Sequence, residues 1–380
     1  MVAATEEWWS FPVAAWVAGP SAIVEAVVCV VVTGAVVGAA IAGAPRSVGE
    51  VTSRWAAAFG AAGAVEATCV MASDRPVEDS GIVEGPRVWG FLNSARMSNT
   101  KNHYFQYKGC NFVSTIYTKE HLEQLQHFEI KDTDVFIVTY PKSGTIWMQQ
   151  IMSLIYSDGD PTAVQNKPAI ERVPWIEVPN SNFPARPSPR LSVTHLPYHL
   201  VPKALKEKKG KIIYVARNPK DVLVSSYYFH QYLALYESPK DFPDFLEKFL
   251  EGRVEFSCWF DHIREWYAHR DEFNFLFMTY EELKKDLRAS IQKICNFVGR
   301  QLDDEKLDNV LEHCRFDSMK KNPMANYEGV PKRSEEGTFL RKGKIGDWKN
   351  HFTVAQSEMF DRVFQEKMKD VPLKFIWDNE

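Results

Sequence analysis

The sequence predicts an α/β fold, a single domain in which a central parallel sheet is flanked by helices. Two observations predict it. Short apolar runs rich in β-branched residues alternate with longer segments of helical periodicity, and a basic, glycine-containing loop follows the first of these runs. Because ligands of such sheets bind at the carboxyl ends of the strands, we expect the functional site at that edge.

The basic, glycine-containing loop lies between the first predicted strand and the first predicted helix. The stretch DVFIVTYPKSGTIWMQQIMSLIY begins with a β-branched run, is interrupted by Pro141, Ser143 and Gly144, and continues with apolar residues on one helical face. Free N–H groups at a helix N-terminus beside Lys142 form an anion site for a phosphate or a sulfate. An ordinary strand-to-helix turn that contains a lysine is the alternative interpretation.

This loop differs from the phosphate-binding loop of nucleotide hydrolases. The Walker A pattern places its lysine after the second glycine, whereas here Lys142 precedes Gly144. A nucleotide kinase or NTPase is therefore disfavoured.

The remaining elements repeat the alternation of strands and helices. The predicted strands are Val135–Tyr140, Leu191–Thr194, Lys211–Ala216 and Phe273–Thr279, and the predicted helices include Thr145–Tyr156, Pro219–Gln231, Asp241–Leu250, Trp259–Arg270 and Ala289–Gly299.

Composition excludes several classes of protein. A net charge of −4 indicates no general attraction to nucleic acid or to an anionic membrane. The six cysteines are scattered without a CxxC pair, which argues against a zinc site and a disulfide framework and suits a reducing compartment.

Residues 1–96 differ in composition from the rest of the chain. They are rich in Ala, Val and Gly and contain no Lys, His, Gln or Tyr, and residues 26–45 form an uncharged run as long as a transmembrane helix. Three interpretations remain open for this segment: a membrane anchor, a disordered or weakly helical extension, or translated sequence upstream of a true start at Met97.

Three further motifs follow the first loop in order. They are THLP around His195, YVARNPKDVLVSS from Arg217 to Ser225, and FLRKGKIGDWKNHF near the C-terminus. Taken singly, each has an ordinary explanation: a structural histidine, a plain strand–helix unit with an exposed arginine, and a solvated basic loop.

Together with TYPKSGTIW, these motifs closely resemble those of the cytosolic sulfotransferases, which use 3′-phosphoadenosine 5′-phosphosulfate (PAPS) as donor. The resemblance covers roughly residues 97–380 and is closest to the amine sulfotransferase branch, which DHIREWYAHRDEFNF and VPLKFIWD also resemble. It implies a catalytic domain at 97–380 with a P-loop-like 5′-phosphosulfate loop. It also implies a cytoplasmic enzyme that transfers the sulfuryl group to a small lipophilic amine, phenol or alcohol.

The resemblance assigns the catalytic roles. His195 would be the general base, and Lys142 would stabilise the leaving phosphate, with Ser225 in contact with that lysine. Many members of the family carry a lysine two residues before the histidine, whereas this chain has Val193 at that position. The amine sulfotransferase branch also lacks that lysine.

The resemblance also assigns the nucleotide ligands, with no metal among them. Donors to the 5′-phosphate would come from the first loop, and ligands of the 3′-phosphate from the second and third motifs, while aromatic residues would flank or bond adenine. The residues are Lys142, Ser143, Gly144 and Thr145 for the 5′-phosphate; Arg217, Ser225, Arg341, Lys342 and Gly343 for the 3′-phosphate; and Trp147, Phe316 and Tyr280 for adenine.

For the acceptor, we predict an apolar pocket wall that includes Phe112, Trp175 and Phe229, although buried aromatic residues are commonly part of the core. The Pro-, Asn- and Ser-rich segment 158–189 is expected to form a long surface excursion near this pocket.

The segment KNHFTVAQSE matches the short dimer-contact motif of the family. We therefore expect a homodimer, with a surface loop leading into a helix as the alternative. The matching residues are Lys349, Thr353, Val354 and Glu358.

Two other functions remain as alternatives. Val193 and the unusual N-terminus leave open a catalytically silent protein that binds PAPS or its product 3′-phosphoadenosine 5′-phosphate (PAP). The apolar run 26–45 leaves open a membrane-anchored sulfotransferase, which is the only reading in which the membrane is a partner.

Overall fold

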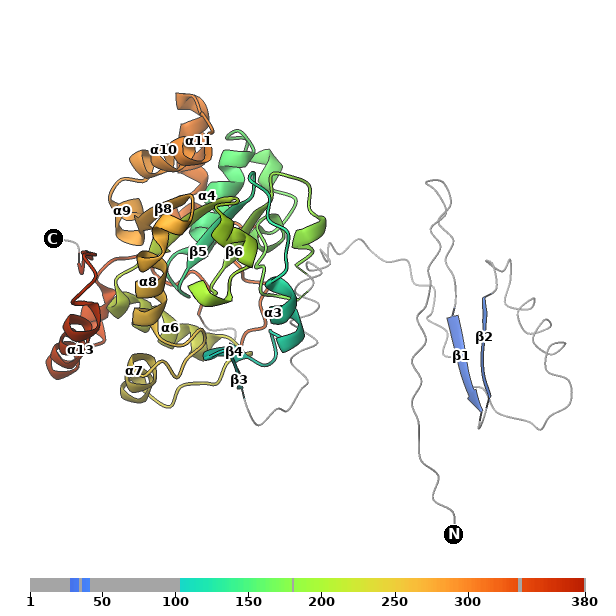
Figure 1. The fold of residues 1–380 in the computed structure, drawn as a ribbon, viewed down its shortest axis with the longest axis horizontal. Helices are drawn as coiled ribbons and strands as arrows, with labels where there is room; N and C mark the ends of the chain where they lie inside the picture. Colours follow the sequence, from blue (N-terminus) through green and yellow to red (C-terminus); the bar gives the residue numbers. More distant parts are fainter. Residues whose placement is uncertain (1–27, 34–35, 42–102, 180, 334–336, 379–380) are drawn as a thin grey trace, which may run out of the picture. The chain divides into compact units, whose positions relative to one another are not determined.

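The computed structural model describes residues 28–33, 36–41, 103–179, 181–333 and 337–378 (Figure 1). The chain divides into two units, Met1–Ser80 and Gly81–Glu380, of which the second contains all the motifs discussed above.

A four-stranded parallel sheet forms the centre of the second unit, in the order β6-β5-β7-β8. This confirms the predicted fold class. The last strand begins two residues later than predicted, at Phe275, because the chain turns through a short 3-10 helix before it. The strands are β5 (Val135–Thr139), β6 (Leu191–Thr194), β7 (Lys211–Ala216) and β8 (Phe275–Thr279).

Helices cover both faces of the sheet (Figure 1). Successive side chains of a strand point to opposite faces, so Val135 and Ile137 join a core cluster with α4, α10 and α11, whereas Phe136 and Val138 join a cluster that includes α6 and α8. Both clusters are buried, as a parallel sheet requires. These helices are α4 (Thr145–Tyr156), α6 (Pro219–Tyr232), α8 (Trp259–Ala268), α10 (Leu287–Val298) and α11 (Asp304–His313).

The remaining elements pack around this framework. β3 (Tyr104–Tyr107) and β4 (Cys110–Val113) form an antiparallel hairpin. The other helices are α3 (Lys119–Leu125), α5 (Ala169–Arg172), α7 (Phe242–Leu250), α9 (Tyr280–Lys285), α12 (Phe316–Lys321) and α13 (Val354–Met368).

The segment between α4 and β6 is not the surface excursion that its composition suggested. Ile176, Glu177 and Phe183 are fully buried, and Trp175 forms a bridge with Val193 beside β6. The apolar residues among the prolines fill the edge of the sheet, so this segment forms part of the core and of the cavity wall.

Part of the N-terminal run 26–45 forms strands. β1 (Val28–Thr33) and β2 (Val36–Ile41) pair antiparallel, so these residues are not the helix considered for this run, in keeping with the β-branched valines of β1. The other residues of 1–96 and the proposed boundary at Met97 lie outside the described residues. Within the described residues, no helix is both long enough and apolar enough to cross a membrane.

A buried ion pair joins the starts of β5 and β6. Arg190 donates from Nε and Nη2 to the carboxylate of Asp134, at 2.9 and 2.5 Å, and both side chains are almost completely buried. The pair holds in alignment the two strands whose other ends lead to Lys142 and His195.

We expect Asp134→Ala to lower the free energy of unfolding by about 3–5 kcal/mol, because it leaves a buried guanidinium without its partner. Urea unfolding at neutral pH measures the effect. Glu207→Ala, which breaks an exposed pair with Lys209, is the control and should cost less than about 1 kcal/mol. Equal small losses in the two variants would contradict the importance of the buried pair.

Candidate active site

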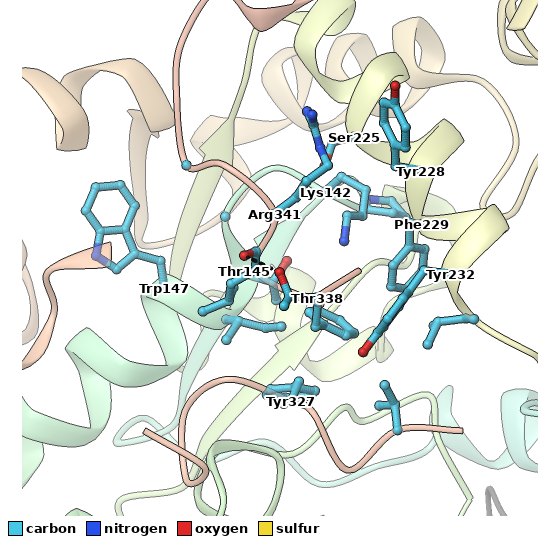
Figure 2. Close-up of a pocket in the computed structure, with 18 of the residues that line it drawn as sticks. Lys142, Thr145, Trp147, Ser225, Tyr228, Phe229, Tyr232, Tyr327, Thr338 and Arg341 are labelled. Atoms are coloured by element: carbon cyan, nitrogen blue, oxygen red, sulfur yellow. Dashed lines mark hydrogen bonds between the residues drawn. The ribbon is translucent and has the colours of Figure 1, made fainter. Parts of the chain in front are cut away.

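A cavity of about 260 Å³ opens at the carboxyl edge of the sheet. Lys142 and Thr145 follow β5, His195 follows β6 and Arg217 follows β7, and all four line the cavity, as the topology of a parallel sheet predicts. Figure 2 shows the side chain of Lys142 between Thr145 and Phe229.

The loop between β5 and α4 requires glycine at one position. Gly144, the N-cap residue before α4, has φ +104°, and a Cβ atom there would lie 3.0 Å from the ring of Tyr280. Lys142 also has a positive φ, 68°, so the loop departs from extended backbone at two of its residues. The hydroxyl of Ser143 is buried and has no hydrogen-bond partner among the described residues.

The ammonium group of Lys142 lies between two aromatic rings, 3.8 Å from the centroid of Phe229 and 4.7 Å from that of Phe339. Burial, together with the nearby cations Arg217 and Arg341, lowers its pKa to about 7, against the opposing effect of Glu255. An anion bound in the cavity would stabilise the charged form of all three side chains.

His195 is held in one orientation by the end of β5. Its Nδ1 lies 2.7 Å from the carbonyl oxygen of Thr139, which can only accept, so Nδ1 carries the proton. Nε2 then keeps its lone pair. Burial and the Lys142 cation lower the pKa of the ring to about 4, against the opposing effect of the Thr139 hydrogen bond, so the imidazole is neutral at physiological pH.

A buried carboxylate holds the backbone of the same residue. The His195 N–H donates to Oε1 of Glu177 at 2.7 Å, and burial raises the pKa of Glu177 to about 8. The histidine is therefore fixed by its ring and by its main chain.

Arg217 links two loops around the cavity. Its guanidinium donates to the carbonyl oxygens of Lys142 and Lys344, each at 3.1 Å, and lies 4.3 Å from the ring centroid of Tyr280. Its Nε is buried without a partner among the described residues. One donor of this side chain thus remains for a ligand.

The loop 338–344 adds three more cations, Arg341, Lys342 and Lys344, and a tight turn. Arg341 and Lys342 both pair with Asp347, at 2.8 and 2.7 Å. Gly343 has φ +63°, and a Cβ atom there would lie 2.3 Å from the ring of Phe316. The absence of a side chain at Gly343 allows the loop to approach that ring.

Three aromatic residues, Trp147, Tyr280 and Phe316, line another part of the cavity, and Trp147 is labelled at the left of Figure 2. Trp147 and Tyr280 pack edge to face with centroids 5.4 Å apart, and the Trp147 indole donates to the carbonyl of Cys314 at 2.8 Å. Phe316 lines the same region. These are the three residues that the resemblance assigned to adenine.

Two predicted site residues do not line the cavity. Phe112 is completely buried and packs against Tyr117 and Phe256, each at 5.5 Å, so the prediction that it forms the pocket wall is wrong. It lies behind the wall because Tyr117 occupies the cavity side. Ser143 is buried within the loop, whereas Trp175 and Phe229 do line the cavity.

The sequence did not single out several residues that line the cavity. Tyr117, Tyr232 and Tyr236 carry phenol groups to it, and Glu255 carries a carboxylate. No motif or periodicity pointed to them.

Comparisons with known proteins agree with this geometry. The family described as "Sulfotransferase domain" matches residues 132–372. An amine sulfotransferase of Oryctolagus cuniculus is 51% identical over 289 residues, covering 74% of this chain and 96% of the relative. Sulfotransferase 2B1 of Rattus norvegicus is 48% identical over 302 residues, covering 77% and 88%.

Two solved structures are similar as well. The mouse sulfotransferase SULT7A1 complexed with PAP has a TM-score of 0.61 at 33% identity, covering 71% of this chain and 95% of that one. Retinol dehydratase in complex with androsterone and PAP has a TM-score of 0.63 at 25% identity, covering 77% and 96%.

Fold, site and relatives thus define a group transferase with a cavity lined by basic side chains at the edge of a parallel sheet. The chain belongs to the cytosolic sulfotransferase family and is a PAPS-dependent sulfotransferase.

Gly343→Ala should weaken the binding of PAP by about tenfold or more, because the new Cβ displaces the Phe316 ring or the loop that carries Arg341. Isothermal titration calorimetry measures the affinity. Gly109→Ala is the matched control: its φ is also positive, +81°, but a Cβ meets nothing within 4 Å. Equal PAP affinity in the two variants would show that the close approach to Phe316 is unimportant.

Proposed function

We propose that the enzyme transfers the sulfuryl group of PAPS to an amine or hydroxyl of a small lipophilic acceptor in the cytoplasm. One observation carries the proposal: a neutral histidine whose Nε2 keeps its lone pair and a buried lysine line the same cavity. PAPS supplies a sulfuryl group activated by its phosphate leaving group.

The residues present suit an adenosine bisphosphate with a sulfuryl group. Six basic side chains line the cavity, which supports binding of a polyanion. The Arg217 Nε, which has no partner among the described residues, is a donor that a phosphate would satisfy. The six basic side chains that line the cavity are Lys142, Arg217, Lys284, Arg341, Lys342 and Lys344. Ser225 on α6 also lines the cavity, beside the proposed 3′-phosphate ligands.

In the proposed mechanism, Nε2 of His195 takes the proton of the acceptor as its oxygen or nitrogen attacks sulfur. The Thr139 carbonyl, which accepts from Nδ1, stabilises the imidazolium that forms. The charge of Lys142 stabilises the negative charge that develops on the leaving phosphate.

Val193 does not take part in this mechanism. Its side chain is completely buried in the core cluster beneath α4 and does not line the cavity. We propose that Lys142 is the main cation at the transferring group.

The other end of the cavity supports a lipophilic acceptor. Trp175, Phe229 and Tyr327 contribute aromatic surface, and apolar side chains such as Ile170 and Val330 surround them. The relatives include an amine sulfotransferase and 3-beta-hydroxysteroid sulfotransferase, which leaves the acceptor class open between amines and alcohols.

We also propose a homodimer through the segment from Lys349 to Glu358. Lys349, Thr353 and Glu358 are exposed there, and Val354 is the most exposed of the large hydrophobic residues described, at 76%. An exposed apolar side chain flanked by charges supports a small contact surface.

Transfer of labelled sulfate from PAPS to a panel of amines, phenols and alcohols tests the function. We expect His195→Ala to lower kcat by about 10²–10⁴-fold and to leave PAP affinity unchanged, since it removes only the base. We expect Arg217→Ala to weaken PAP binding by about 10–100-fold through lost charge-assisted hydrogen bonds. Circular dichroism checks the fold of both. Equal losses of turnover and PAP affinity in both variants would contradict the separate roles.

The pH dependence tests Lys142. Its lowered pKa means that the free enzyme loses the ammonium proton as the pH rises through about 7, so kcat/KM for PAPS should fall above that pH. Lys142→Arg keeps its charge and should remove this alkaline decline, at a lower maximum. Because the pKa of Glu255 also lies at about 7, Glu255→Gln is the control and should retain the decline. A decline that persists in Lys142→Arg would exclude Lys142 as its cause.

A further inference from the structure

Glu255 is the one carboxylate among the described residues that line the cavity. It belongs to the loop between α7 and α8, which carries none of the residues proposed for the nucleotide. The next residue, Phe256, packs against the ring of His195 with centroids 5.3 Å apart. Glu255 is therefore close to the proposed base, on the acceptor side of the cavity.

One oxygen of this carboxylate has a partner and the other has none. The phenol of Tyr236 donates to Oε2 at 2.6 Å. Oε1 is buried and accepts no hydrogen bond from the described residues. A buried carboxylate oxygen without a donor is costly, so an oxygen of this kind beside a cavity indicates a donor on the ligand.

The surroundings of Glu255 allow it to carry a charge. Burial raises its pKa to about 7, whereas the hydrogen bond from Tyr236, the nearby phenol of Tyr117 and the charge of Lys142 act in the opposite direction. A cation that enters the cavity beside it would complete the ionisation of the carboxyl group.

We propose that Glu255 binds a protonated nitrogen on the acceptor, through the oxygen that has no partner in the protein. The proposal rests on the proposed function, because it names the acceptor class of that same site. A protonated nitrogen has no lone pair and cannot attack sulfur. The acceptor must then carry a second group, a hydroxyl or a neutral amine, that reaches His195.

The acceptor class is thus defined by two polar ends on a lipophilic frame. Phenols or alcohols with a basic side arm fit this description, and so do diamines in which one nitrogen is neutral. The aromatic residues around Glu255, among them Tyr117 and Tyr236, would cover the frame.

Two probes of nearly equal size test the proposal: tyramine and 4-propylphenol, which differ by an ammonium group in place of a methyl group. Their dissociation constants are measured on the PAP-saturated enzyme, and sulfate transfer to the phenol is measured with PAPS. We expect Glu255→Gln to weaken tyramine binding by at least about tenfold relative to 4-propylphenol.

The control variant is Glu251→Gln, an exposed glutamate of the same loop region paired with Arg253, and it should leave the preference unchanged. PAP affinity and thermal unfolding show whether Glu255→Gln is folded.

The outcomes separate the two proposals. A tyramine preference that is the same in wild type and Glu255→Gln, or that is absent from the wild type, overturns the role of Glu255. Loss of the tyramine preference in Glu255→Gln supports the role of Glu255, even if neither probe is sulfated. Absence of sulfate transfer to every compound of the acceptor panel would count against the proposed function alone.

Discussion

The pairing of β5 with β6 is the constraint on which the site depends. Parallel register places Val138 opposite Thr194, so the residues that follow, Thr139 and His195, emerge side by side at the carboxyl edge. The hydrogen bond from His195 Nδ1 to the Thr139 carbonyl is possible only in this register. A slip of one residue would move every side chain of the strand to the opposite face of the sheet and take the histidine away from the lysine loop.

The same edge brings the cations together, and their mutual repulsion has a cost. Lys142, Arg217 and Arg341 come from three separate segments, and the two guanidinium groups add to the effect of burial in lowering the pKa of Lys142. Asp347 pairs with Arg341 and Lys342, and Phe229 and Phe339 face the ammonium of Lys142. These contacts hold the cations in position without neutralising them, which suits a polyanionic ligand.

The sequence predicted the features that regular structure carries, and not those that depend on side-chain direction in irregular segments. The strands were predictable because β-branched runs bury both faces, and the site loops because they follow the strand ends. Phe112 was misassigned because an aromatic residue in a short strand has the same sequence pattern whether it lies in a core or in a pocket wall. Glu255 precedes Phe256 and Ser257, whose φ values of 57° and 61° fit no periodic pattern, so nothing in the sequence indicated where its side chain points.

The distribution of charge in the cavity connects donor binding with acceptor binding. An anionic donor placed among the six cations would raise the pKa of Lys142 and hold it charged for catalysis. It would also offset the charge of Lys142, which favours the ionised form of Glu255 on the acceptor side. Once the donor is bound, a cationic group on the acceptor becomes the main source of positive charge for that carboxylate. The two ligands would thus complement opposite charges in one cavity, and the neutral histidine between them would meet the reacting group of the acceptor.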